Sequence, residues 1–124
     1  MSDQLRGVVA CHGRLAEALV EAAERISGVS GALVPVSNAG CDRDDLERRI
    51  AEAIDGHPAV VFVDTPSGSC LFAALHQSRL GRSVKVVSGV NLAMLLDFVF
   101  HRDLAPAAAA ERAAAAGCRA IKVP

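Results

Sequence analysis

His12 is the residue whose type and setting most clearly predict chemistry in this sequence. It follows an apolar run at residues 7–11 and precedes Gly13, after which a helical pattern begins. The first N–H groups of a helix lack partners and carry the positive end of its macrodipole, so this junction attracts anions. An imidazole placed there can attack a phosphoryl group, and the product would be stabilised where it forms.

The segments that would position His12 alternate between short β-rich runs and longer helical stretches. Strands are predicted at residues 7–11, 32–36, 59–63 and 83–88. Helices are predicted at residues 13–26, 43–55, 70–79, 91–100 and 106–117. This alternation indicates a single three-layer α/β domain over residues 1–124, with a mainly parallel sheet in the common order 2-1-3-4. A short apolar run, Ala120–Val123, predicts a C-terminal edge strand.

The helical periodicity also predicts which face of the first helix is buried. Apolar residues recur there at helical spacing, namely Leu15, Leu19, Ala22, Ala23 and Ile26. Asp42 is the expected N-cap of the second helix.

The predicted topology brings a carboxylate to His12. Ligands of such sheets bind outside the carboxyl ends of the strands, at the point where strand order reverses. His12 follows the first strand and Asp64 follows the third. We expect Asp64 to accept a hydrogen bond from Nδ1–H of His12, which leaves Nε2 free as a nucleophile.

Further residues at the same sheet edge are candidates for phosphate binding. Gly13 and Arg14 would offer the N–H groups of the first helix, and Ser69 would add a donor from the loop after the third strand. Ser69 is equally suited to cap the following helix, and Asn91 to cap the one after it.

Composition excludes several classes of function. The 124 residues carry a formal net charge of −1, and they include neither tryptophan nor tyrosine. Such a chain has no basic surface or aromatic platform for nucleic acid. No apolar stretch approaches the roughly 20 residues that span a bilayer, so we expect no membrane insertion. The first residues look unlike a secretory signal, which predicts the cytoplasm.

The cysteines and the remaining histidines are given structural roles. Four cysteines without a C-x-x-C pair predict free thiols. No metal site and no cofactor are expected, because the spacing of His12, Cys11 and Cys70 matches no standard ligand pattern. None of Cys11, Cys41 and Cys70 has an arginine six residues later, which excludes a cysteine phosphatase. The other three histidines are expected at the surface, namely His57, His76 and His101.

Three segments resemble the mannose-family IIA domains of the bacterial sugar phosphotransferase system. Residues 11–19, CHGRLAEAL, resemble that family's HGxLAxxL segment. Residues 63–70, VDTPSGSC, resemble its VDxxGGSP loop, and residues 87–95, VSGVNLAML, resemble its TGVNLPML segment. The three occur in the family's order and spacing, and the similarity covers nearly the whole chain.

The resemblance implies a cytoplasmic phosphocarrier. Such a protein takes phosphate from the histidine phosphocarrier protein onto its active histidine and passes it to a IIB partner. His12 matches that histidine, and Asp64 matches the carboxylate that orients it. The resemblance also implies a homodimer, with the last strand packing across the interface.

The chain departs from the family pattern at Ser67, Cys70 and Ala93. Ser67 would strain and stiffen the loop, because glycine reaches backbone angles there that serine adopts only at a cost. We expect Ser67, Cys70 and Asn91 to form a rim over which a IIB partner approaches.

Two alternative functions remain open. One is the phosphotransfer subunit of a dihydroxyacetone-kinase-like system, which shares the fold and an early histidine. The other is a non-catalytic regulatory module of the same fold. The sequence names neither the sugar nor the IIB partner.

Overall fold

A computed structural model describes residues 4–81 and 83–124, so residues 1–3 and 82 of the predicted domain lie outside it. Within the described residues, four parallel strands form one sheet in the order β2-β1-β3-β4, as the sequence predicts. The strands are β1 (Arg6–Cys11), β2 (Leu33–Ser37), β3 (Ala59–Val63) and β4 (Val84–Ser88). The helices are α1 (Leu15–Ser27), α2 (Arg43–Ile54), α3 (Ser69–Arg79), α4 (Leu92–Val99) and α5 (Pro106–Arg119).

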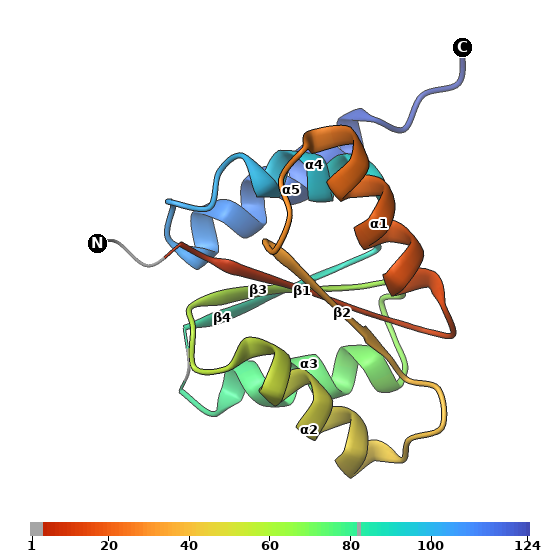
Figure 1. Ribbon diagram of the computed structural model, residues 1–124, viewed down its shortest axis with the longest axis vertical. Coiled ribbons are helices and arrows are strands. Elements are labelled where there is room, and N and C mark those ends of the chain that lie inside the picture. Colours follow the sequence, from red (N-terminus) through yellow and green to blue (C-terminus); the bar gives the residue numbers. More distant parts are fainter. Residues whose placement is uncertain (1–3, 82) are drawn as a thin grey trace.

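The sheet lies between two helical layers. Helices α1, α4 and α5 cover one face, and α2 and α3 cover the other (Figure 1). All five residues of β3 are buried, which is typical of a central parallel strand covered on both faces. Alternate residues of β3 therefore face opposite layers: Phe62 packs in the α1 and α4 layer, and Val61 packs against α2 and α3.

Helix ends follow local sequence chemistry. The Asp42 carboxylate accepts from the Asp45 N–H and caps α2, as predicted. Asn91 caps α4 in the same way, by accepting from the Met94 N–H. Pro106 begins α5, where its missing N–H costs nothing.

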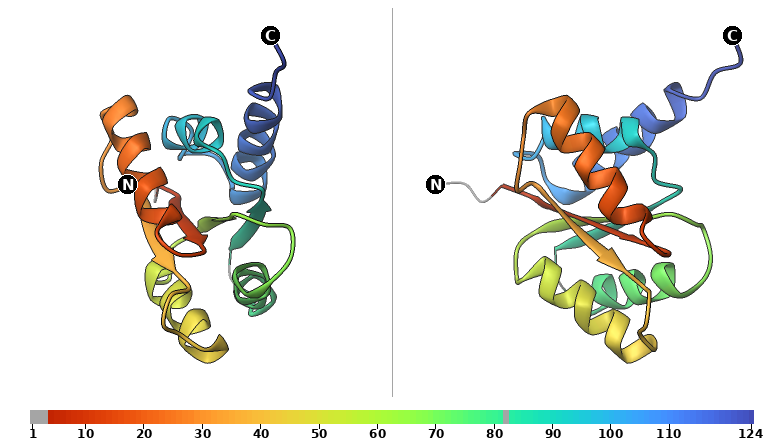
Figure 2. Two further views of the ribbon diagram at one scale, coloured as in Figure 1. Left: turned by 90° about the vertical axis from the view of Figure 1, so that its right-hand side faces the viewer. Right: turned by 45° about the vertical axis from the view of Figure 1, so that its right-hand side comes forward.

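The prediction of a strand at Ala120–Val123 is wrong for the chain by itself. After α5 the described residues form no strand, and the chain runs away from the sheet (Figures 1 and 2). Ile121 is 75% exposed and Val123 is 99% exposed. Periodicity identified an apolar segment, but a strand also needs a sheet edge within reach.

Gly7 marks the tightest packing between β1 and the helical layer above it. A Cβ atom at Gly7 would lie 2.6 Å from both Leu33 Cδ2 and Phe98 Cε2. The Phe98 ring is itself held edge-on against Phe62, with 5.3 Å between the ring centroids. We expect Gly7→Ala to lower the free energy of unfolding by about 1–3 kcal/mol, because the buried rings cannot move without strain. Denaturant unfolding measures this.

Gly117→Ala is the matched control for that substitution. The added Cβ at Gly117 would lie 2.5 Å from both Cγ and Cε of Met94 and 3.2 Å from Asn91 Oδ1, but an unbranched methionine side chain adapts to crowding more readily than a ring does. Alanine also gains about 1 kcal/mol over glycine in a helix interior. A loss of stability as large as that of Gly7→Ala would show that the rigidity of the Phe98 ring is not what makes the Gly7 substitution costly.

Candidate active site

The site lies at the carboxyl edge of the sheet, where adjacent strands β1 and β3 end. Ala10 pairs with Val63, so the residues that follow each strand emerge side by side. His12 follows β1, and Asp64 follows β3 directly. The topology therefore places an imidazole next to a carboxylate, as the sequence predicts.

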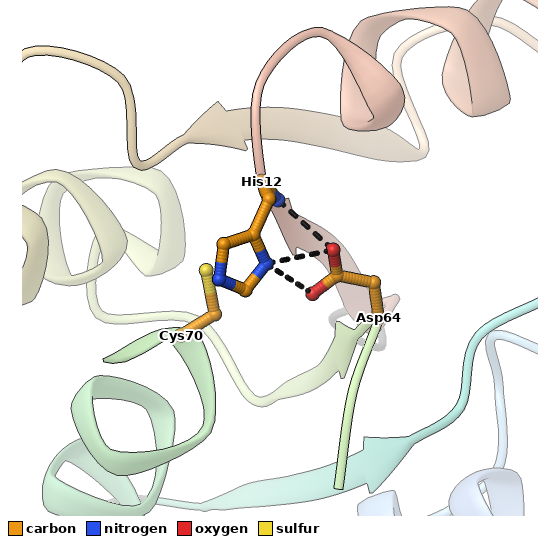
Figure 3. Close-up of side chains that lie close together, drawn as sticks. All are labelled: His12, Asp64 and Cys70. Carbon is orange, nitrogen blue, oxygen red and sulfur yellow. Dashed lines mark hydrogen bonds and ion pairs between the residues drawn. The ribbon is translucent and has the colours of Figure 1, made fainter. Parts of the chain in front are cut away.

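Two parts of His12 bond to the same carboxylate. Its Nδ1 lies 2.9 Å from Oδ2 and 3.1 Å from Oδ1 of Asp64, and its backbone N–H donates to Oδ2 at 3.0 Å (Figure 3). A carboxylate only accepts, so this geometry assigns the ring proton to Nδ1. The lone pair then lies on Nε2, and the His12 side chain is 47% exposed.

Asp64 stays ionised in this setting. Its side chain is 11% exposed, and burial alone would raise the pKa of the carboxyl. The hydrogen bonds from the backbone and the ring of His12 outweigh burial and lower that pKa below its usual value. A fixed negative charge therefore lies against Nδ1.

The turn after His12 is held by the loop that follows β2. Gly13 adopts a positive φ of 59°, which favours glycine. Its N–H donates to Asn38 Oδ1 at 3.1 Å, and its carbonyl accepts from Ser37 Oγ at 2.6 Å. The Gly13 N–H is thus already bonded, so the prediction that it is free to bind phosphate needs correction. Arg14 occupies the N-cap position of α1 and is exposed.

Asn38 was not predicted from the sequence. It comes from a short loop 25 residues beyond Gly13, and a contact of that range has no local signature. Its place after β2, at the carboxyl edge of the sheet, is the signal that identifies it as a candidate.

The amino end of α3 lies beside the His12 ring. Ser69 is the first residue of this helix and is exposed, while Cys70 comes next and is fully buried. A ring nitrogen of His12, an Asp64 oxygen and the Cys70 sulfur all lie within 4.8 Å of one another. The N–H groups in the first turn of α3 have no partners within the helix, so this helix offers the open anion site near His12.

Two predicted rim residues lie elsewhere. Cys70 points beneath the ring instead of outward, because the second residue of α3 faces the core. The Asn91 side chain is half-buried, and besides capping α4 it donates to the Gly117 carbonyl at 3.1 Å. Ser67 is exposed as expected, but its φ is not positive, so the predicted backbone strain is absent.

The buried thiols at this edge are protonated at neutral pH. Burial, with a further contribution from the Asp64 charge, raises the pKa of Cys11 to about 12 and that of Cys70 to about 11. All four cysteines are free, as predicted. A protonated thiol is a weak nucleophile, so the imidazole of His12 is the candidate nucleophile at this edge.

The other histidines take no part in the site. His57 precedes β3 at the opposite edge of the sheet, where it lines a hollow of about 480 Å³. His76 is exposed on α3, 4.0 Å from Glu47, and His101 lies after α4 within 2.7 Å of the Asp97 carbonyl. Among the described residues that line this hollow there is no carboxylate to orient His57 as Asp64 orients His12, so its size does not indicate a second active site.

A smaller hollow lies next to the site. It has a volume of about 200 Å³ and opens between the loop after β2 and the start of α3. Asn38, Ser69 and Phe72 contribute to its lining, and Phe72 is 53% exposed.

The fold and the site together define a class: small three-layer α/β proteins with an exposed histidine, oriented by a carboxylate, at the carboxyl edge of a parallel sheet. The sequence model described as "PTS system fructose IIA component" matches residues 7–116. The chain therefore belongs to this family, EIIA-man, of the phosphotransferase system, and has a role in sugar phosphotransfer. The family resemblance predicted from the three motifs is confirmed.

Solved structures show the same fold. The phosphotransferase system component EIIA from Streptococcus agalactiae is 19% identical, with 96% of each chain covered and a TM-score of 0.89. The mannose/sorbose specific IIA subunit from Enterococcus faecalis is 21% identical, covering 98% of this chain and 95% of that one, with a TM-score of 0.86. The PTS IIA protein associated with the fucose utilization operon of Streptococcus pneumoniae is 21% identical, covering 99% and 96%, with a TM-score of 0.78. A search of curated protein sequences found no match.

In residues 4–81 and 83–124, no helix has both the length and the apolar character needed to cross a bilayer.

Proposed function

We propose that His12 accepts a phosphoryl group on Nε2 from the histidine phosphocarrier protein and passes it to a IIB partner. The observation that carries this proposal is the bond from Nδ1 to Asp64, at 2.9 Å, which leaves the Nε2 lone pair available on a half-exposed ring. Family membership supports the same class of chemistry.

The transfer needs no general base. The Nε2 lone pair forms a bond to phosphorus, the phosphorus–nitrogen bond of the donor breaks, and the donor ring keeps that electron pair. The Nδ1 proton remains in its bond to Asp64, and the ionised carboxylate stabilises the positive charge that His12 gains. Passing the group to a IIB partner is the same exchange with the roles reversed.

The phosphoryl oxygens would meet the amino end of α3. Cys70, in the first turn of this helix, lies on the side of the ring away from Nδ1 (Figure 3), and the exposed Ser69 is the helix's first residue. Oriented N–H groups stabilise an anion there without any rearrangement. Arg14, exposed at the start of α1, adds a cation at the same edge.

The partners would dock over this edge. The exposed Phe72 ring and the hollow beside it form a recessed apolar contact surface next to Ser69. Ser67, exposed in the same loop, is placed to affect the choice of IIB partner. Because the donors of such a system work in the cytoplasm, we place this chain there, and its free thiols agree with a reducing compartment.

Phosphorylation in a reconstituted system tests the proposal. The chain is incubated with phosphoenolpyruvate, the first enzyme of the system and the phosphocarrier protein. We expect about one phosphate per chain, stable in base and labile in acid, as a phosphoramidate is. Adding an unphosphorylated IIB protein should remove that phosphate. A chain that stays unlabelled with an active donor would refute the proposal.

We also propose a homodimer in which residues 120–123 pair with the sheet of a second copy. The support is the exposed apolar side chains of Ile121 and Val123, together with the free edge of β4. Pairing across a two-fold axis would cover both these apolar side chains and the free edge of β4. A chain ending at Arg119 keeps α5 whole, and light scattering should show it as a monomer or as aggregates. A monomeric full-length chain would contradict the dimer.

A further inference from the structure

Three potential metal ligands converge at the carboxyl edge of the sheet. A ring nitrogen of His12, a carboxylate oxygen of Asp64 and the sulfur of Cys70 lie within 4.8 Å of one another. Each comes from a different segment: His12 follows β1, Asp64 follows β3, and Cys70 lies in the first turn of α3. The strand order and the start of α3 therefore hold the three groups together.

The donor types match one class of metal ion. Imidazole nitrogen and thiolate sulfur are the ligands that Zn²⁺ prefers, at about 2.0–2.1 Å and about 2.3 Å. The sulfur lies on the side of the ring that carries Nε2, away from the bond to Asp64 (Figure 3). An ion bonded to both Nε2 and the sulfur would therefore leave the bond between Nδ1 and Asp64 intact. A carboxylate on the far nitrogen of a metal-binding histidine is a recurrent support for zinc.

We propose that His12 and Cys70 bind a zinc ion, oriented by Asp64, and that this ion excludes a phosphoryl group from His12. The half-exposed imidazole meets the ion first, and the buried sulfur beneath it completes the pair of protein ligands. Water molecules fill the remaining positions of the tetrahedron.

The binding step is a proton exchange without oxidation or reduction. The S–H bond of Cys70 breaks, its proton passes to solvent, and a zinc–sulfur bond forms. The Nε2 lone pair forms the second bond to the ion, and Nδ1 keeps its proton. The same Nε2 lone pair is needed to attack phosphorus, so the ion and the phosphoryl group cannot occupy His12 together. This second half of the proposal depends on the proposed function, whereas the binding of the ion does not.

Metal titration of the full chain, with no phosphoryl donor present, tests the site directly. Co²⁺ reports thiolate coordination by a sulfur-to-metal charge-transfer band, and calorimetry in two buffers counts the protons that Zn²⁺ releases. We expect one ion and one released proton per chain. Affinity should fall by about 100-fold or more in Cys70→Ser, Cys70→Ala and His12→Gln, since losing a ligand exceeds the 10- to 100-fold effect of losing its support.

Two matched controls separate this site from adventitious binding. Cys118→Ser removes an exposed thiol on α5, and His76→Gln removes an exposed imidazole on α3. Both should keep the affinity and the charge-transfer band of the parent chain. Unchanged zinc affinity in both Cys70 variants would overturn the site, and so would loss of the band in Cys118→Ser.

Phosphorylation with and without zinc then tests the exclusion. Each variant is compared with its own rate in the absence of metal, so any direct effect of Cys70 on transfer cancels. We expect zinc to inhibit the parent chain and to spare Cys70→Ala. Equal inhibition of both would mean that zinc acts on the upstream proteins, and the exclusion would be refuted. If the chain binds zinc at Cys70 but never accepts phosphate, the proposed function fails and the metal site stands.

Discussion

His12→Gln is expected to carry no phosphate from the phosphocarrier protein. Glutamine keeps a polar side chain of similar length, but its amide nitrogen has no lone pair that can attack phosphorus. Neither buried thiol at this edge replaces it, because Cys11 and Cys70 remain protonated at neutral pH. Labelling from phosphoenolpyruvate, measured per mole of chain, should fall to background.

His76→Gln is the matched control for this loss. It makes the same change in the exposed imidazole on α3, which lies against Glu47 and not against Asp64. Its labelling should equal that of the parent chain, and circular dichroism should show that both variants fold. Labelling of His12→Gln at the parent level would move the phosphate to another residue and refute the assignment.

The central strand β3 was predictable because it is covered on both faces. Residues 59–63 form an uninterrupted apolar run between Pro58 and Asp64, and the structure places β3 over those same residues. A parallel strand that is buried on both faces is apolar along its whole length, so its first and last residues are clear from the sequence. The contact between His12 and Asp64 then followed from strand order, since adjacent parallel strands end at one edge.

The buried face of α1 differs in part from the predicted one. Leu15 and Ile26 were expected in the core but are 44% and 62% exposed. Ala23 is buried as predicted, and Ala16 and Val20, which were not predicted, face the core beside it. Periodicity weighs bulky side chains most, whereas a helix packed closely on a sheet buries small ones, and the spacing of the two layers is a tertiary property.

The surroundings of His12 were less predictable than its partner. Two features depend on how two loops and α3 meet above the sheet: the hydrogen bond between Asn38 and Gly13, and the position of Cys70 beneath the ring. A one-residue change in the start of a helix turns a side chain by about 100°, enough to move Cys70 from rim to core. Sequence spacing cannot resolve such a difference.

Asp64→Asn is expected to slow phosphoryl transfer by about 10- to 100-fold, the range known for loss of the hydrogen-bonding partner of a metal-binding histidine. Oδ2 of the carboxylate accepts both the backbone N–H and the ring Nδ1–H of His12, and Oδ1 also lies 3.1 Å from Nδ1. In asparagine one of these two positions becomes an NH₂ group, which cannot accept. If its NH₂ group faces the ring, Nδ1 must accept and the proton moves to Nε2, which removes the nucleophilic lone pair. The positive charge on the phosphorylated ring also loses its counter-charge.

Rapid-quench measurement of a single transfer from the phosphorylated phosphocarrier isolates this step. Asp97→Asn is the matched control, because Asp97 is as buried as Asp64, with 12% of its side chain exposed against 11%, and pairs with Arg112 at 3.3 Å. Both variants remove a largely buried charge, so both should lose some stability on thermal unfolding. If Asp64 positions His12, the transfer rate should fall in Asp64→Asn and stay at the parent value in Asp97→Asn. Equal rates in the two variants would leave the carboxylate with no role beyond holding the loop.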